Sequence, residues 1–590
     1  MTNFASNVLR YAAAHPEAPA QMVREGSAWA PVSHGTLMAR VFSLAGWLAQ
    51  QGIQDGDRVA LQAHTSAEWV WADLALLSLG AVVVPIYPSL AAAQVAELLE
   101  DSGARFAIVA DADQEAKLPV SFPRLVMTYP RWQQAITRGG VPEGSPWLDN
   151  IDRVADDHLA TLVYTSGTTA HSRGVMLTHG NLLSNVAGLI LHAERYPDVQ
   201  LTARDRALAV LPLAHIFERL VHHFMLGRGV AMYYTHPSRL AEDITTARPT
   251  AMVSVPRIYE RVFAAVHDQA AGPLSRPMLA ASIPVARRRA LRLTAGARPT
   301  AREWLAESLF SLLVYRKIRR ALGGSLRFAY SGGAPLHPDL ARFFVGAGIP
   351  VLEGYGLTET SPVVSVNTLS TLRIGSVGLP LPNVEVRIEA DGEICCRGPN
   401  IMQGYWNRPE ESAAVLVDGW FYTGDIGERL PSGHLRIVDR KRAIMVLSTG
   451  KNVVPLAICQ ALEASPWIEQ AMLLGDRKKY VAALLAPDEA QLAAWAASQG
   501  LPADNLEAAR KHPAYRALID AEVKARTASF ADFEQPKRWE LVDRPFTEES
   551  GELTPTLKIK TRVVEAHYGA LIATLYPEED LASLNTPTSS

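Results

Sequence analysis

The chain has 590 residues, of which 48% are hydrophobic and 20% are charged, and its formal net charge is −3. The chain is longer than the size at which a single hydrophobic core keeps growing, so we expect at least two domains. The small negative charge argues against nucleic acid as the main partner. Three cysteines are too few and too poorly spaced for a disulfide framework or a zinc site, which suits a reducing cytoplasm.

Short apolar strands alternate with longer helical patterns through most of the chain. Strand-like runs occupy residues 58–62, 105–110, 160–163 and 251–255. This alternation predicts the α/β class, with layered subdomains built on parallel sheets. The longest uncharged stretch, residues 74–95, is divided by Gly80 and ended by Pro85 and Pro88, which predicts a helix followed by a buried strand instead of a membrane span. The N-terminus lacks a basic region followed by an apolar core, so no secretory signal is expected.

The pattern changes near residue 373, where short strands of period two begin. Runs at 384–388 and 392–398 predict antiparallel hairpins in a small β-barrel-like unit. A further strand at 435–439 leads into three consecutive basic residues. We therefore predict an N-terminal domain at 1–439, a hinge at 440–442, an α+β C-terminal domain at 443–577, and a disordered tail at 578–590.

A loop rich in hydroxyl groups follows the strand at 160–163. Residues 164–175 contain five serine or threonine side chains and two glycines. Small residues free backbone N–H groups, and hydroxyls donate hydrogen bonds at little cost in volume, so this composition suits a phosphate. The Walker order GxxxxGK[ST] is absent, and a polar surface loop is the alternative. The candidate phosphate-binding residues are Thr165, Ser166, Gly167, Thr168, Thr169 and Arg173.

Four later segments, in this order after the loop, resemble the adenylate-forming superfamily of acyl-CoA synthetases, luciferases and peptide-synthetase adenylation domains. They are 355–360 (YGLTET), 422–425 (YTGD), 439–442 (DRKR) and 555–558 (PTLK). The resemblance covers residues 5 to about 575. Segments 211–219 (LPLAHIFER), 255–261 (VPRIYER) and 331–336 (SGGAPL) resemble the long-chain fatty acyl-CoA synthetase branch. The resemblance implies a ligase that uses ATP, Mg²⁺ and CoA, and a smaller C-terminal domain that is mobile.

Two carboxylates carry roles under this resemblance. Glu359 would hold Mg²⁺, which takes one or two carboxylates together with phosphate oxygens, and a helix-capping glutamate is the alternative. Asp425 would accept hydrogen bonds from the ribose hydroxyls, with an Asx-turn aspartate as the alternative. The resemblance also implies that Arg440 binds ribose and that Arg442 occupies the hinge.

A lysine is expected to stabilise the charge that develops on the α-phosphate. The resemblance assigns this role to Lys558, with Lys560 as its rival within reach. Thr165 and Arg173 join Glu359 and Lys558 as the predicted catalytic group.

The remaining predictions concern adenine and the acyl chain. The resemblance implies that His215, Phe217, Val255 and Arg257 border the acyl chain, where His215 contacts substrate without acid–base work. Ser331 and Gly332 are also expected at the substrate, beside an adenine-binding surface formed by Ser331, Gly332, Gly333, Ala334, Glu353, Gly354 and Tyr355. Gly356 and Thr358 are predicted to bind the nucleotide as well.

Several positions depart from the family pattern. Relatives usually carry glycine at Ala170 and lysine at Arg173, and an alanine methyl can restrict a positive-φ geometry. Acidic residues are common at Ala443 and Cys459. The first pair puts pyrophosphate handling in question, and the second pair the CoA-binding conformation.

The segment 276–320 is rich in arginine and includes Trp304 and several leucines. It predicts either a solvated helical face or a basic amphipathic surface that contacts an inner membrane peripherally. We expect a cytoplasmic fatty acid:CoA ligase. Its rivals are an enzyme that loads an acyl carrier protein and a non-catalytic acyl or nucleotide sensor.

Overall fold

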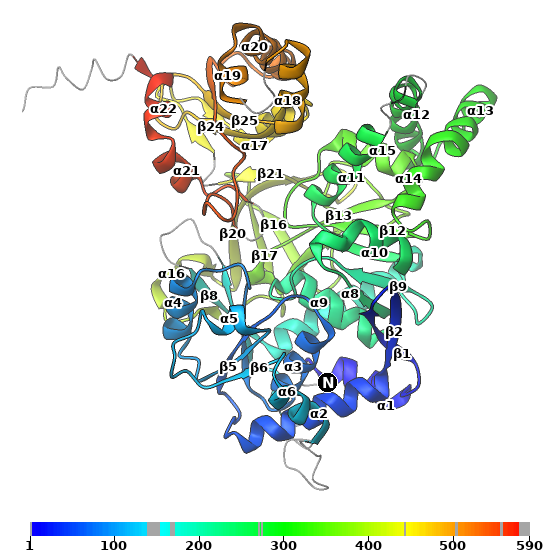
Figure 1. Ribbon diagram of the computed structural model, residues 1–590, viewed down its shortest axis with the longest axis vertical. Helices are drawn as coiled ribbons and strands as arrows, with labels where there is room; N and C mark the ends of the chain where they lie inside the picture. The colour runs from blue at the N-terminus through cyan, green and yellow to red at the C-terminus, as the bar shows by residue number, and fades with distance from the viewer. Residues whose placement is uncertain are drawn as a thin grey trace, which may run out of the picture. The chain divides into compact units, whose positions relative to one another are not determined.

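The computed structural model describes residues 3–138, 151, 154–165, 172–269, 272, 275–441, 444–501, 506–554 and 558–577 (Figure 1). The chain separates into two compact units. The larger comprises Met1–Glu389, Ile394–Thr423 and Arg429–Arg436, and the smaller comprises Ala390–Glu393, Gly424–Glu428 and Ile437–Ser590. The final division follows Arg436, a few residues before the predicted hinge, whose Arg442 lies outside the described residues.

A nine-stranded sheet forms the first layer of the larger unit, in the order β15-β14-β13-β12-β11-β9-β10-β1-β2. Neighbours from β13 to β1 are parallel, and the strands at both edges are antiparallel. Its strands are β1 (Pro19–Glu25), β2 (Ala28–Ser33), β9 (Arg206–Ala209), β10 (Ala231–Tyr234), β11 (Ala251–Ser254), β12 (Phe328–Ser331), β13 (Val351–Gly356), β14 (Val363–Val366) and β15 (Leu379–Pro380).

A seven-stranded sheet forms the second layer, in the order β18-β8-β7-β4-β3-β5-β6. Its strands are β3 (Arg58–Gln62), β4 (Val82–Ile86), β5 (Phe106–Val109), β6 (Arg124–Val126), β7 (Leu159–Thr165), β8 (Arg173–Thr178) and β18 (Gly404–Tyr405). The predicted helix and buried strand within 74–95 are confirmed, because α3 (Ala67–Ser78) is followed by a fully buried β4. Among the described residues, none of the helices combines the length and apolar character that a membrane crossing requires.

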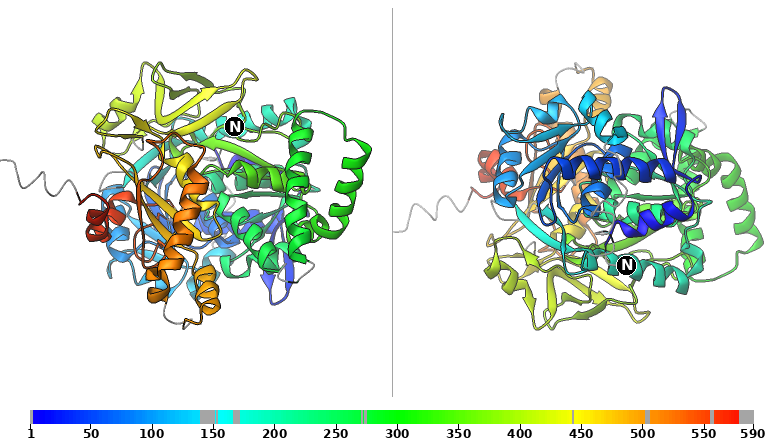
Figure 2. Two further views of the ribbon diagram at one scale, coloured as in Figure 1. Left: turned by 90° about the horizontal axis from the view of Figure 1, so that it is seen from above. Right: turned by 90° about the horizontal axis from the view of Figure 1, so that it is seen from below.

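Helices connect and cover these strands, as Figure 2 shows from two sides. The apolar face of α3 is buried together with Trp69, which is 0% exposed, and the long α2 packs beside it. The helices before β11 are α1 (Ser6–Ala14), α2 (His34–Gln50), α4 (Ala92–Ser102), α5 (Ala112–Glu115), α6 (Pro130–Arg138), α8 (His179–Arg195), α9 (Ile216–Gly227) and α10 (Leu240–Ala247), with the short 3-10 turns η1 (Pro197–Val199) and η2 (Pro237–Arg239).

The helices that follow β11 include a long pair. Helix α12 (Ser275–Thr294) packs on α15 (Pro338–Gly346), and Gly346 permits this approach because a Cβ there would lie 1.9 Å from the Ala286 carbonyl oxygen. Helix α13 (Ala301–Phe310), the π-helical turn η3 (Ser311–Tyr315) and α14 (Arg316–Ala321) form one continuous helical run. The Arg292–Glu307 ion pair joins α12 to α13. Helix α11 (Pro256–Gln269) precedes this group.

The predicted hairpins near residue 390 are confirmed, since β16 (Glu385–Ile388) pairs antiparallel with β17 (Glu393–Arg397). They belong to a five-stranded sheet completed by β19 (Leu416–Val417), β20 (Trp420–Arg429) and β21 (Leu435–Arg440). Helix α16 (Pro409–Val415) precedes β19, and the 3-10 turn η4 (Thr358–Thr360) follows β13.

The smaller unit is of the α+β type. Its three-stranded sheet contains β24 (Ile468–Leu474), β25 (Ala482–Pro487) and β26 (Arg538–Leu541), and β22 (Met445–Val446) pairs with β23 (Asn452–Val453). Its helices are α17 (Pro455–Glu463), α18 (Glu489–Ser498), α19 (Leu506–Lys511), α20 (Pro513–Thr527), α21 (Thr561–His567) and α22 (Gly569–Leu575).

Candidate active site

The predicted adenine and acyl residues of the larger unit lie at one edge of the nine-stranded sheet. Strands β9, β11, β12 and β13 run parallel, so their carboxyl ends meet at the same edge. Val255 follows β11, Gly332 follows β12, and Gly356 ends β13. Open α/β sheets bind ligands outside the carboxyl ends of their strands. This edge is therefore a candidate binding surface.

The predicted adenine and acyl segments touch each other at Gly332. A Cβ placed on Gly332 would lie 2.8 Å from Phe217 Cε1, and one on Gly333 would lie 3.8 Å from Val255 Cγ1. The Gly332 N–H donates to the Ser254 carbonyl oxygen at 3.1 Å. A side chain at 332 would therefore have to displace the ring of Phe217.

His215 and Arg257 take part in local structure at this edge. The Nδ1 of His215 accepts from the Phe217 N–H at 3.2 Å, which caps the start of α9. Arg257 lies 3.6 Å from Glu260 in an ion pair on α11. The capping bond fixes the backbone of Phe217 at the start of α9. Contact of His215 or Arg257 with the substrate stays a prediction.

Glu353 is a buried carboxylate within the predicted adenine-binding surface. Its side chain is 8% exposed, and its Oε1 accepts from the Leu336 N–H at 3.3 Å. Burial raises the pKa of Glu353 to about 7. The two glycines that follow it are explained by close packing, because a Cβ on Gly356 would lie 1.9 Å from the Pro362 carbonyl oxygen and one on Gly354 would lie 3.3 Å from that of Ser365.

A second cluster joins Glu359 to Arg173 through Tyr405. The Tyr405 hydroxyl donates to Glu359 Oε1 at 2.9 Å, and Glu359 is 8% exposed. The Arg173 guanidinium lies 4.5 Å from the centre of the Tyr405 ring and 3.3 Å from Glu411. Burial and the charge of Glu359 raise the pKa of Tyr405 well above its ordinary value, so its hydroxyl keeps the proton that it donates.

Sequence reasoning missed Tyr405. The residue lies in the two-residue strand β18, which pairs with β8 across a long interval of sequence, with Tyr405 opposite Val175. The segment 404–406 carries no motif of its own. Its pairing with the strand that starts at Arg173, and the hydrogen bond from the Met402 N–H to the Glu359 carbonyl oxygen at 2.9 Å, bring it to Glu359.

The hydroxyl-rich loop connects the antiparallel strands β7 and β8. Thr165 lies opposite Arg173 at the point where the two strands separate. The Thr165 hydroxyl is buried and, within the part of the chain that the structure describes, has no hydrogen-bond partner. Buried polar groups are nearly always satisfied, so an unpaired hydroxyl here suits a ligand. Ser166, Gly167, Thr168, Thr169 and Ala170 lie outside the described residues.

In the smaller unit, Asp425 and Arg440 are paired. Arg440 Nε lies 3.0 Å from Asp425 Oδ1, and the side chains are 55% and 5% exposed respectively. The neighbouring Asp439 is buried and accepts from the Leu456 N–H at 3.2 Å. Burial raises the pKa of Asp439. The two predicted ribose ligands are thus adjacent.

Lys558 is exposed on a loop whose base is anchored. Its N–H donates to Thr554 Oγ1 at 3.0 Å, and its carbonyl oxygen accepts from the Thr554 N–H at 2.9 Å. The Lys560 N–H donates to the Glu552 carbonyl oxygen at 2.7 Å. Lys560 precedes α21 and is half-buried, whereas Lys558 is exposed. Ala443 and residues 555–557 lie outside the described residues.

Glu552 forms the anchor beneath this loop. Its side chain is fully buried and accepts from Arg544 at 2.6 and 3.0 Å and from Ser550 at 2.6 Å. His567 Nδ1 lies 2.9 Å from the same carboxylate. Burial opposes ionisation, but these hydrogen bonds outweigh it and lower the pKa of Glu552 to about 2.

Comparison with known proteins places these residues in a family context. The AMP-binding enzyme family matches residues 8–406, and the AMP-binding enzyme C-terminal domain matches residues 442–580. The long-chain-fatty-acid–CoA ligase FadD15 of Mycobacterium bovis is 34% identical over 93% of each chain. The peroxisomal long chain acyl-CoA synthetase 7 of Arabidopsis thaliana is 31% identical over 93% of this chain and 82% of its own.

Solved structures share the fold. The o-succinylbenzoate CoA synthetase of Bacillus subtilis, in complex with the acyl-adenylate intermediate, superposes with a TM-score of 0.68 at 21% identity and covers 95% of this chain and 97% of its own. The A domain of carboxylic acid reductase from Segniliparus rugosus, in complex with AMP and a carboxylic acid, has a TM-score of 0.72 at 21% identity, covering 98% and 94%. The chain therefore belongs to the AMP-binding enzyme family, and within it to the branch of the long-chain-fatty-acid–CoA ligases.

Proposed function

We propose that this protein is a fatty acid:CoA ligase that works in two half-reactions. The carboxylate of a fatty acid attacks the α-phosphate of ATP, which forms acyl-AMP and releases pyrophosphate. The thiol of CoA then attacks the acyl carbonyl, which forms acyl-CoA and releases AMP. The observation that carries this proposal is the contact between Gly332 and Phe217, because it sets a predicted acyl residue directly against the predicted adenine-binding surface.

The adenylation step requires control of negative charge on three phosphates. Thr165 and Arg173 are proposed to bind the outgoing pyrophosphate, since the hydroxyl of Thr165 is buried and unpaired among the described residues and Arg173 supplies positive charge opposite it. Asp425 and Arg440 are proposed to bind ribose. Lys558 is proposed to stabilise the charge on the α-phosphate.

Glu359 is the proposed Mg²⁺ ligand. Its buried carboxylate is oriented by Tyr405, and one carboxylate with phosphate oxygens meets the preference of Mg²⁺. In the parts of the chain that the structure describes, no three His, Cys, Asp or Glu residues gather at a metal-binding distance, which fits an ion held largely by the oxygens of ATP. When bound, Mg²⁺ would neutralise phosphate charge.

The test measures products across a panel of fatty acids, with and without CoA. We expect AMP and pyrophosphate only when a fatty acid is present, and acyl-CoA when CoA is added. ADP as the product would contradict adenylation. Acyl-AMP that accumulates while CoA is ignored would indicate another acceptor, such as an acyl carrier protein, and tight binding without turnover would indicate a sensor.

A further inference from the structure

Exposed apolar side chains concentrate on the α12–α13 pair and η3. Of the twelve large hydrophobic residues that are exposed among the described residues, seven lie between residues 291 and 313. Four of them are more than half exposed and belong to the run from α13 to η3. We call this set the apolar ridge: Trp304 (61% exposed), Leu305 (64%), Leu309 (52%) and Leu312 (62%).

The apolar ridge continues into arginine residues along the same helical run. Leu305, Leu309 and Leu312 are followed by Arg316 and Arg320 at intervals of three or four residues, and all five are exposed. Residues at these intervals share one side of a helix. Figures 1 and 2 show α13 on the outer side of α12, away from α15. One exposed helical surface therefore changes from apolar to cationic along its length.

This part of the chain is strongly basic although the whole protein is not. Residues 287–320 carry ten arginine or lysine residues and two glutamates, against a net charge of −3 for the entire chain. Glu307 is committed to the Arg292 ion pair between α12 and α13. Glu303 caps α13 by accepting from Thr300. Acidic residues within 287–320 therefore balance only a small part of the positive charge of this segment.

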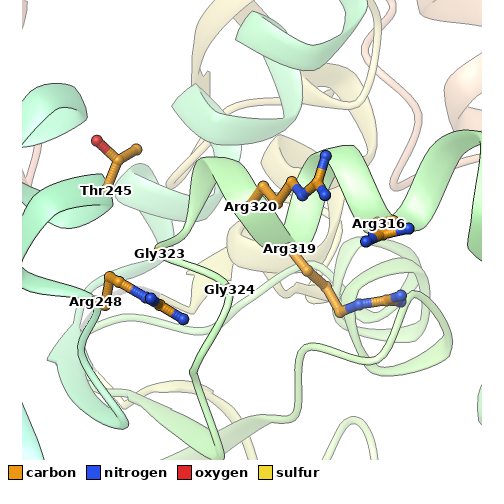
Figure 3. Close-up of a pocket in the computed structure, with 7 residues that line it drawn as sticks. All are labelled: Thr245, Arg248, Arg316, Arg319, Arg320, Gly323 and Gly324. Atoms are coloured by element: carbon orange, nitrogen blue, oxygen red, sulfur yellow. The ribbon is translucent and has the colours of Figure 1, made fainter.

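An arginine pocket lies at the end of the same run. It has a volume of about 550 Å³ and is lined by Thr245, Arg248, Arg316, Arg319, Arg320, Gly323 and Gly324. Figure 3 shows Arg248, which follows α10, and the arginines of α14 on opposite sides of the turn at Gly323 and Gly324. Four arginine residues from two separate elements thus line one pocket.

The fixed contacts of these arginines are to neutral groups. Arg319 donates to the Ala347 carbonyl oxygen at 2.8 Å and to Ser311 Oγ at 3.1 Å, and Arg248 donates to Ser325 Oγ at 3.3 Å. Within the described ranges, no carboxylate lies within the 4.0 Å ion-pair distance of any of the four. Burial and the positive charges of Arg289 and Arg316 lower the pKa of Arg319. The pocket therefore gathers positive charge that an external anion can neutralise.

We propose that this surface docks on an anionic phospholipid bilayer, with the apolar ridge entering the interfacial layer and the arginine pocket binding lipid phosphates. Interfacial helices combine an apolar face with arginine and lysine in this way, and guanidinium groups bind phosphate through two parallel hydrogen bonds. The contact is peripheral. It goes beyond the proposed function, since vesicle binding requires no turnover.

Two other occupants fit the surface less well. A soluble phosphate would account for the arginine pocket but leave the apolar ridge in water, where contiguous apolar surface is rare unless it serves a contact. A second copy of the chain would cover the apolar ridge but bring two strongly basic surfaces together, which like-charge repulsion opposes.

The experiment is cosedimentation of the full chain with vesicles of neutral phosphatidylcholine and with vesicles that also contain phosphatidylglycerol. Two double variants separate the components, Arg316→Gln/Arg320→Gln for charge and Leu309→Ser/Leu312→Ser for insertion. The matched controls change exposed residues elsewhere, Arg477→Gln/Lys511→Gln, whose side chains are 92% and 75% exposed, and Val120→Ser at 92%. Thermal melting confirms that each variant is folded.

We expect wild type to bind the anionic vesicles and to release them as salt rises. Each arginine removed should weaken binding about five-fold, and the leucine variant should lose on the order of ten-fold, while the controls bind as wild type does. Equal binding to neutral vesicles, or binding unchanged in either double variant, would overturn the proposal. So would full competition by millimolar inorganic phosphate at constant ionic strength, or a dimer in light scattering that the leucine variant abolishes.

Discussion

Glu359 in the larger unit and Lys558 in the smaller unit are held in opposite ways. Glu359 is 8% exposed and accepts a hydrogen bond from Tyr405, whereas Lys558 is exposed on a loop whose backbone is hydrogen-bonded to Thr554. The larger unit thus orients the carboxylate of Glu359 before a ligand binds, while the smaller unit carries the ammonium group of Lys558 on a loop whose backbone is hydrogen-bonded. Substitutions at Glu359 and its supports should disturb ligand binding, and substitution at Lys558 should disturb chemistry alone.

The largest effect should come from Lys558→Ala. Loss of a charge that stabilises the transition state typically lowers turnover on the order of 100-fold. We expect that loss in acyl-AMP formation, measured by pyrophosphate release, while thioester formation from supplied acyl-AMP and the melting temperature are retained. Lys560→Ala is the matched control. Equal loss in both half-reactions would refute the assignment, and loss at Lys560 instead would transfer the role.

The second-largest loss of adenylation activity should come from Glu359→Gln. The substitution keeps the shape and the bond with Tyr405 but removes the negative charge that Mg²⁺ prefers, so adenylation should fall about 30-fold, in the range of a lost bond to a charged group. The activity should recover in part as Mg²⁺ is raised. A Mg²⁺ titration of pyrophosphate release measures this, and an unchanged half-saturation concentration would remove Glu359 from the metal site.

Tyr405→Phe tests whether Glu359 needs its support. Loss of the single hydrogen bond should reduce adenylation about five-fold and raise the Mg²⁺ requirement. Tyr129→Phe is a close control, because Tyr129 donates to Glu115 at 2.7 Å on the surface. Steady-state kinetics at fixed fatty acid distinguish the two, and equal effects would show that the buried tyrosine has no special role.

The smallest effect concerns Glu353 and pH. Its pKa is raised from 4.5 to about 7 by burial, so the folded state binds the proton more tightly than the unfolded state. Its contribution to stability is therefore fully present below about pH 4.5 and is lost as pH rises through 7. We expect Glu353→Gln to flatten this part of the melting-temperature profile, with a gain of ~1–2 °C at pH 8. Parallel profiles for the two proteins would contradict the shift.

The sequence placed those site residues that belong to local motifs. Glu359, Asp425 and Lys558 lie in short ordered segments whose resemblance to a known family implies their roles, and the predicted strand at 251–255 corresponds to β11, which ends at Ser254. Tyr405 could not be predicted in this way, because a two-residue strand carries no periodicity and its partner strand is distant in sequence.

The arginine-rich segment shows the same limit on the surface. Its composition favours a solvated helical face and leaves a peripheral membrane contact as the alternative. The arginine pocket includes Arg248, which follows a different helix, and Arg248 lines the same pocket as Arg316 and Arg320 because α10 packs against α14. The composition of a segment gives its charge, but the packing of the helices determines which charged residues from other segments lie beside it.

Because Gly332 lies against the ring of Phe217, the effects of substitutions at these two positions depend on each other. Alanine at 332 is acceptable to the backbone, since its φ is not positive, but its methyl would collide with the Phe217 ring. A smaller side chain at 217, as in Phe217→Leu, would leave room for the methyl group of an alanine at 332. If Phe217 borders the acyl chain as proposed, efforts to widen the range of acids that this protein accepts should vary 217 and 332 together, because a side chain at 332 alone would displace the Phe217 ring.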